Sequence, residues 1–101
     1  MEISQLQHDS ATIARKHGFH NFPCELDMFL ATKIALIHSE LSEALEDLRK
    51  NDMVHFGEEL ADAVIRIADL AELAQLDLEA EITRKMSINI NREYMHGGKS
   101  F

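Results

Sequence analysis

The sequence contains no tryptophan, one cysteine, one proline and four glycines among its 101 residues. A lone cysteine, Cys24, cannot form an internal disulfide, so nothing indicates an oxidising compartment. No apolar run approaches the roughly 18 residues that a membrane span needs. The N-terminus also lacks the basic start and apolar core of a signal peptide. We therefore expect no membrane association and a cytoplasmic location.

Basic residues are also scarce: ten Lys and Arg stand against eighteen Asp and Glu, giving a formal net charge of −8. Nucleic-acid-binding surfaces need dense Lys/Arg patches, so we expect no nucleic-acid partner. A small anionic substrate is still compatible with this charge if a metal ion intervenes. The length predicts one domain, residues 1–101, with a core of its own.

The apolar periodicity predicts helices joined by short connections. A first helix is predicted over about residues 3–17, ended by Gly18, and an irregular segment follows. The second helix is predicted to start near Asp27 as its N-cap. Its apolar stripe steps by three or four residues: Leu30, Ile34, Ile37, Leu41, Leu45 and Leu48.

The third predicted helix, from about Met53 to Ala74, is apolar on nearly all sides, which requires burial on more than one side. A last helix is predicted to open at Asp77 as N-cap and to end before His96. We therefore predict an all-α fold, a four-helix bundle-like arrangement of antiparallel helices completed by oligomerisation as a homodimer or homotetramer.

Two carboxylate pairs stand out on the second and third predicted helices, where Glu40 and Glu43, and Glu59 and Asp62, are each three residues apart. If the chain turns at residue 51, the two pairs lie at matching depths, about 12 and 16 Å from the turn. Four converging carboxylates repel one another unless a cation or protons intervene, and oxygen-only ligands favour magnesium. The alternative is two solvated helix faces, with Lys33 and Arg66 as ordinary ion-pair partners.

The charges are segregated along the chain. Residues 25–81 hold fifteen acidic and four basic residues, whereas residues 82–101 hold four basic residues and one acidic residue. If the last helix folds back over the second and third, its cations reach phosphate oxygens that the metal does not. Complementation of a helix dipole is an equally good explanation.

The runs KIALIHSELSEALEDLRK, FGEELADAVIRIADLAELAQLDLE, KMSINI and HGGK resemble the MazG-like branch of the all-α nucleoside triphosphate pyrophosphohydrolases. The resemblance covers about residues 33–99. It implies that magnesium, or manganese, is held by four residues that are also catalytic: Glu40, Glu43, Glu59 and Asp62. One departure is Ser39, which stands where many relatives have another glutamate.

The resemblance also implies a substrate-binding set. Lys85 and Asn89 match the family's C-terminal Lys and Asn, which touch the phosphates and the nucleoside. Arg92, Tyr94 and Lys99 fall in the tail that completes the pocket. Phe19 or His20 is placed to stack on the base, although plain packing is the alternative for Phe19.

The reaction implied is hydrolysis of a nucleoside triphosphate to the monophosphate and pyrophosphate, as in nucleotide-pool house-cleaning. One rival within the same class is hydrolysis of a related pyrophosphate of the phosphoribosyl-ATP type. A rival from another class is a non-catalytic acidic helical module that binds a protein partner.

Overall fold

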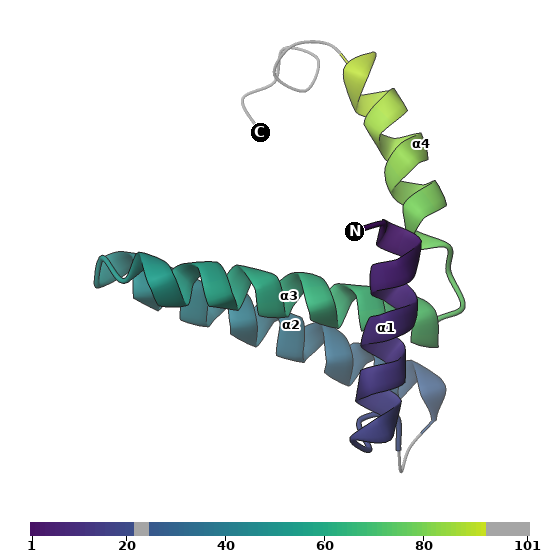
Figure 1. Ribbon diagram of the computed structural model, residues 1–101, viewed down its shortest axis with the longest axis horizontal. Helices are drawn as coiled ribbons and strands as arrows, with labels where there is room; N and C mark the ends of the chain where they lie inside the picture. The colour runs from purple at the N-terminus through teal and green to yellow at the C-terminus, as the bar shows by residue number, and fades with distance from the viewer. Residues whose placement is uncertain (22–24, 93–101) are drawn as a thin grey trace.

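The computed structural model describes residues 1–21 and 25–92. Four helices follow one another in the order α1 (Ile3–Lys16), α2 (Leu26–Arg49), α3 (Met53–Leu73) and α4 (Leu78–Ile90), and no strand occurs in these two ranges. The prediction of an all-α fold is confirmed (Figure 1). None of the described helices is both long enough and apolar enough to span a membrane.

Helices α2 and α3 form an antiparallel hairpin whose turn is centred on Asn51 (Figure 1). Asn51 has φ 58°, a left-handed conformation that asparagine tolerates better than most residues. Asp52 caps α3: its Oδ1 accepts from the backbone N–H of His55 at 3.2 Å, and its Oδ2 lies 2.5 Å from His55 Nδ1. The predicted turn at residue 51 is therefore confirmed.

Small side chains bring the helices together. Ala44 of α2 and Ala63 of α3 are buried in the hairpin. Ala11 and Ala14 of α1 are buried, and Ala68 of α3 is fully buried. Helix α1 packs across the end of α3 that lies away from the hairpin turn (Figure 1). Among the larger apolar side chains of the described residues only Phe29 and Ile37 are buried, and the others stay partly exposed, so this core is narrow.

The start of α2 differs from the prediction. Glu25 occupies the N-cap, and Asp27 lies inside the first turn. There its carboxylate still interacts favourably with the positive end of the helix dipole.

The start of α4 is tied to α1. The side chain of Gln7 donates to the carbonyl of Leu76 at 2.6 Å and accepts from the N–H of Leu78 at 3.1 Å. Asp77 is the N-cap, as predicted, and accepts from the N–H of Ala80 at 3.0 Å.

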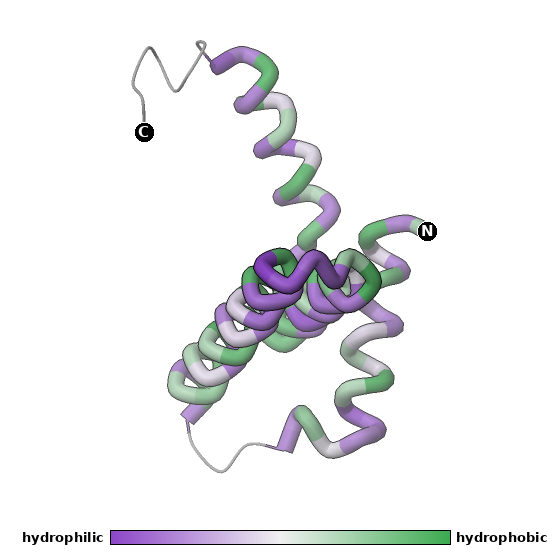
Figure 2. The backbone as a smooth tube through the Cα atoms, turned by 90° about the vertical axis from the view of Figure 1, so that its left-hand side faces the viewer, coloured by the Kyte–Doolittle hydropathy of each residue, from purple (hydrophilic) through white to green (hydrophobic). Residues whose placement is uncertain are grey.

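Beyond this start, α4 extends away from the hairpin (Figures 1 and 2), and none of its residues is buried. The arrangement in which the last helix folds back over the second and third is therefore not found within the protomer. The bonds made by Gln7 direct α4 away from the hairpin, so the four helices do not close into a bundle within one chain.

Candidate metal centre

Three of the four predicted carboxylates converge across the hairpin. Glu40 and Glu43 of α2 and Glu59 of α3 each offer one oxygen, and these oxygens all lie within 4.8 Å of one another. The three-residue spacing puts Glu40 and Glu43 on one side of α2, and the turn at Asn51 brings Glu59 alongside them. We call Glu40, Glu43 and Glu59 the carboxylate cluster.

The cluster changes the acidity of its central member. A hydrogen bond with Glu40, partial burial and the nearby Glu43 raise the pKa of Glu59 to about 7, from 4.5. Each of these effects favours the neutral form: a protonated Glu59 shares a hydrogen bond with Glu40, burial disfavours a charge, and a third negative charge would face two others. Near neutral pH a proton thus occupies the cluster for part of the time.

The donor set fits a hard divalent cation. All three donors are carboxylate oxygens, which magnesium prefers. The three oxygens lie within 4.8 Å of one another, close enough for all three to contact one ion. Glu40, Glu43 and Glu59 are thus the residues that would hold the ion.

Asp62 is not a member of the cluster. It is exposed, one turn farther along α3 than Glu59. Arg66, one turn farther still, donates from Nε to Oε1 of Glu40 at 3.0 Å. The structure therefore places a guanidinium beside Glu40.

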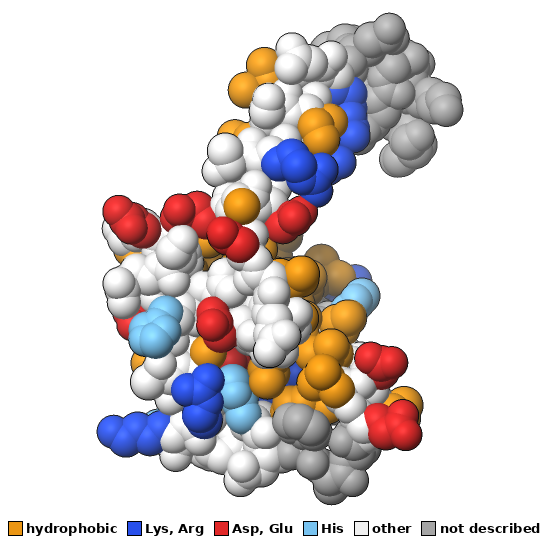
Figure 3. Space-filling model, turned by 90° about the vertical axis from the view of Figure 1, so that its right-hand side faces the viewer, with side chains coloured by type: hydrophobic (Ala, Val, Ile, Leu, Met, Phe, Trp, Pro, Cys, Tyr) orange, Lys and Arg blue, Asp and Glu red, His pale blue; other side chains and the backbone are white. Residues whose placement is uncertain are grey.

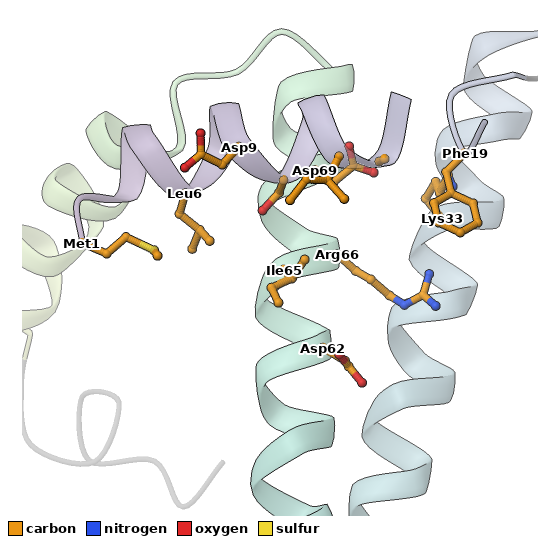
Figure 4. A pocket seen from close by; sticks show the side chains of 12 residues that line it. Met1, Leu6, Asp9, Phe19, Lys33, Asp62, Ile65, Arg66 and Asp69 are labelled. Carbon is orange, nitrogen blue, oxygen red and sulfur yellow. The ribbon is translucent and has the colours of Figure 1, made fainter. Parts of the chain in front are cut away.

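A cavity of about 410 Å³ adjoins the cluster between α1, α3 and the start of α2 (Figure 4). Its wall is mostly apolar and carries charged groups from α2 and α3. It is lined by Met1, Leu6, Asp9, Ser10, Ile13, Ala14, Phe19, Lys33, Asp62, Ile65, Arg66 and Asp69. Asp62 and Arg66 connect the cavity to the cluster, because both line it and Arg66 also contacts Glu40.

Of the two residues predicted to stack on the base of a nucleotide, Phe19 lines the cavity and His20 does not. Phe19 is 60% exposed and lines the cavity, with Lys33 Nζ 5.4 Å from its ring centroid. His20 instead turns to α3, where its Nε2 lies 2.5 Å from Oδ1 of Asp69, and both side chains are 11% exposed. The segment after α1 is thereby attached to α3, with Phe19 at the cavity.

The predicted phosphate-binding residues lie elsewhere. Lys85, Asn89 and Arg92 are exposed on or just after α4, which extends away from the hairpin (Figure 1). Basic side chains gather along α4 beyond an acidic start (Figure 3). The protomer does not bring Lys85 or Asn89 to the cluster. Tyr94 and Lys99 lie outside the described residues.

Sequence reasoning overlooked Asp69 and the part of the cavity formed by α1. Asp69 is only 8% exposed. The sequence did contain an indication of this burial, because Asp69 is a carboxylate inside the apolar run from Ile67 to Ala71. Charged residues are rarely buried without a partner.

Comparisons with protein-family models, curated proteins and solved structures found no match.

Proposed function

We propose that this chain is a magnesium-dependent nucleoside triphosphate pyrophosphohydrolase of the MazG-like kind, acting in nucleotide-pool house-cleaning. The observation that carries the proposal is the convergence of Glu40, Glu43 and Glu59 beside a cavity of about 410 Å³. That volume lies within the range of small-molecule sites, and the apolar wall with few charged groups is typical of them. The sequence resemblance supports the same assignment.

In this proposal the substrate's base enters the cavity, where Phe19 offers an aromatic face. Arg66 is placed to reach phosphate oxygens, because it lines the cavity and touches the cluster. An unprotonated carboxylate of the cluster takes the proton from the attacking water. Bound magnesium would supply charge neutralisation for the triphosphate. Water attacks a phosphorus of the anhydride between the α and β phosphates. The bond between that phosphorus and the bridging oxygen breaks, and the bridging oxygen leaves with the other phosphorus, so that the products are the monophosphate and pyrophosphate.

The predicted roles of Lys85, Asn89 and Arg92 stay part of the proposal. Since α4 extends away from the cluster within one chain, these side chains would need either a rotation of α4 or a second copy to reach the substrate. We accordingly propose that the enzyme is a homo-oligomer.

The decisive assay is a nucleotide panel with magnesium, in which pyrophosphate release and the nucleotide product are measured. Glu43→Gln and Glu59→Gln should each lower kcat/KM by at least about a hundredfold. The matched control is Glu46→Gln, because Glu46 lies on the same helix but pairs at the surface with Arg49 at 2.8 Å. That variant should keep wild-type activity.

The same assay separates the rival functions. Pyrophosphate release from phosphoribosyl-ATP alone would favour a pyrophosphohydrolase of the phosphoribosyl-ATP type. If no pyrophosphate is a product and magnesium does not raise the melting temperature, the proposal is overturned in favour of the acidic interaction module. Magnesium should otherwise stabilise the protein, because it would bind only the folded cluster.

A further inference from the structure

Two buried polar side chains, one from α1 and one from α3, line the cavity. Ser10 of α1 is 6% exposed and Asp69 of α3 is 8% exposed. Asp69 lies where α1 crosses α3 (Figure 4), and Ser10 belongs to the buried face of α1 that packs there. Polar groups that are buried in a protein are usually hydrogen-bonded, so the bonds that these two side chains lack are informative.

Each of the two side chains keeps hydrogen-bonding capacity that the protein does not use. Oδ1 of Asp69 accepts from Nε2 of His20 at 2.5 Å, which holds the carboxylate in one orientation. Within residues 1–21 and 25–92, neither Oδ2 of Asp69 nor the hydroxyl of Ser10 makes a hydrogen bond. Because both residues line the cavity, a bound molecule can supply the missing partners.

Asp69 lies at the far end of the cavity along α3, as seen from the carboxylate cluster. It is the last of the four α3 residues that line the cavity: Asp62, Ile65, Arg66 and Asp69 (Figure 4). Along the helix axis it is about 15 Å from Glu59. A nucleotide whose phosphates lie at the cluster and at Arg66 therefore directs its base toward Asp69, with the edge opposite the sugar foremost.

The chemistry of that edge differs between bases. Cytosine and adenine carry an amino group there, which donates hydrogen bonds, whereas uracil, thymine and guanine carry a carbonyl oxygen, which only accepts. An ionised carboxylate also only accepts. Asp69 can therefore bond to an amino group and repels a carbonyl oxygen. The hydroxyl of Ser10 both donates and accepts, so it can pair with the neighbouring ring nitrogen of either kind of base.

We propose that Asp69 determines which base is bound, so that the cavity takes cytosine and adenine in preference to bases with a carbonyl group at the same position. The inference rests on the proposed function, because that function sets the direction in which the nucleotide lies. Ser10 adds affinity for both kinds of base, and His20 is a positioning residue that holds Asp69. The mostly apolar wall leaves little water to relieve a mismatch, which makes an unpaired group costly.

The first test uses the wild-type protein. With magnesium present, kcat/KM is measured for two matched pairs of substrates, dCTP with dUTP and ATP with ITP. Within each pair the exocyclic group changes from amino to carbonyl, and the adjacent ring nitrogen gains a hydrogen. The amino member of each pair should be preferred at least about tenfold, because a site built to bond an amino group rejects an analogue that lacks it. Equal values, or a preference for dUTP and ITP, would overturn the inference.

The second test replaces the carboxylate. Asp69→Asn offers an amide that can donate as well as accept, so the ratio of kcat/KM between the members of each pair should fall to within about threefold of one. If Asp69 only stabilised the fold by pairing with His20, the substitution would affect all four substrates equally. An unchanged ratio in Asp69→Asn would therefore overturn the inference. If this variant does not fold, the wild-type ratios still decide the question.

The third test replaces the hydroxyl of Ser10. Ser10→Ala removes one oxygen atom, and it should lower kcat/KM by roughly three- to tenfold for both members of a pair, because one hydrogen bond to the base is lost. Thr12→Ala is the matched control: Thr12 is an exposed residue of the same helix, and its hydroxyl donates to the carbonyl of His8 at 2.9 Å. The control should keep wild-type values. Wild-type values in Ser10→Ala would exclude Ser10 from the base site.

Binding of nucleoside monophosphates, measured by calorimetry without magnesium, separates this inference from the proposed function. The dissociation constant of dCMP should be at least about tenfold lower than that of dUMP. This preference without pyrophosphate release from any triphosphate would contradict the proposed function and leave the selection of the base standing. Pyrophosphate release from dCTP and dUTP with equal kcat/KM would support the proposed function and overturn the inference. A protein that binds neither monophosphate and hydrolyses no triphosphate would overturn both.

Discussion

Arg66 of α3 donates its Nε–H to Oε1 of Glu40 on α2 at 3.0 Å, so a permanent cation lies against one member of the carboxylate cluster. The side chain of Glu40 is 13% exposed, which makes this charge partner more effective than a solvated one. The guanidinium therefore already neutralises part of the negative charge that would otherwise attract a metal ion.

Replacing Arg66 should therefore strengthen magnesium binding. Arg66→Gln removes the competing positive charge, and we expect the dissociation constant for magnesium to fall roughly tenfold, equivalent to about 1.4 kcal/mol. Isothermal titration calorimetry measures it directly. Arg49→Gln is the control, because Arg49 pairs with Glu46 at the surface and should leave the affinity unchanged. Weaker binding in Arg66→Gln would show that the arginine supports the metal instead of competing with it.

The raised pKa of Glu59, about 7, predicts a stability that depends on pH. Between 4.5 and about 7 the folded state holds a proton that the unfolded state has already released. The contribution of Glu59 to stability is therefore full below 4.5, and it is lost as pH rises through about 7. The free energy of unfolding of the metal-free protein should fall across this window, as urea titrations at a series of pH values would measure.

Glu59→Gln is the control for this window, because glutamine keeps the neutral form at every pH. The difference in stability between the variant and the wild type should widen as pH rises. Saturating magnesium should reverse the trend in the wild type, since the ion requires the deprotonated carboxylate and releases its proton. Parallel pH profiles for the two proteins would show that Glu59 titrates normally.

The buried pair of His20 and Asp69 should contribute to folding. His20→Ala leaves the carboxylate of Asp69 without this partner, which should lower the free energy of unfolding by about 1–3 kcal/mol. Thermal and urea denaturation measure the change. His38→Ala is the control, because His38 is exposed and its replacement should alter stability by less than about 0.5 kcal/mol. Equal effects of the two substitutions would exclude a structural role for the pair.

The hairpin was predictable because its signals are local. Apolar positions every three or four residues define α2, and a long apolar run defines α3. The polar residues around Asn51 interrupt them, so the turn and the convergence of Glu40, Glu43 and Glu59 follow from helix geometry. The same argument was insufficient for Asp62. Equal distances from a turn fix depth, but they do not fix the direction of a side chain around the helix.

The position of α4 was not predictable from the sequence, because it depends on individual side-chain hydrogen bonds between residues that are far apart in the chain. The bonds of Gln7 to Leu76 and Leu78 span about seventy positions and leave no periodic trace in the sequence. The charge segregation suggested that α4 returns to the hairpin, but charge complementarity does not say whether it acts within one chain. The pairing of His20 with Asp69 was missed for the same reason.

The separation of Asp62 from the cluster gives a sharp test of which carboxylates hold the ion. Because Asp62 lines the cavity and is not among the three converging side chains, Asp62→Asn should change the dissociation constant for magnesium by less than about threefold. Glu43→Gln should raise it by more than about tenfold, because it removes one charged oxygen donor of the three. The same calorimetric titration measures both variants. Equal losses of affinity would place Asp62 among the ligands and would require α3 to rotate or the Asp62 side chain to swing toward Glu59 when the ion binds.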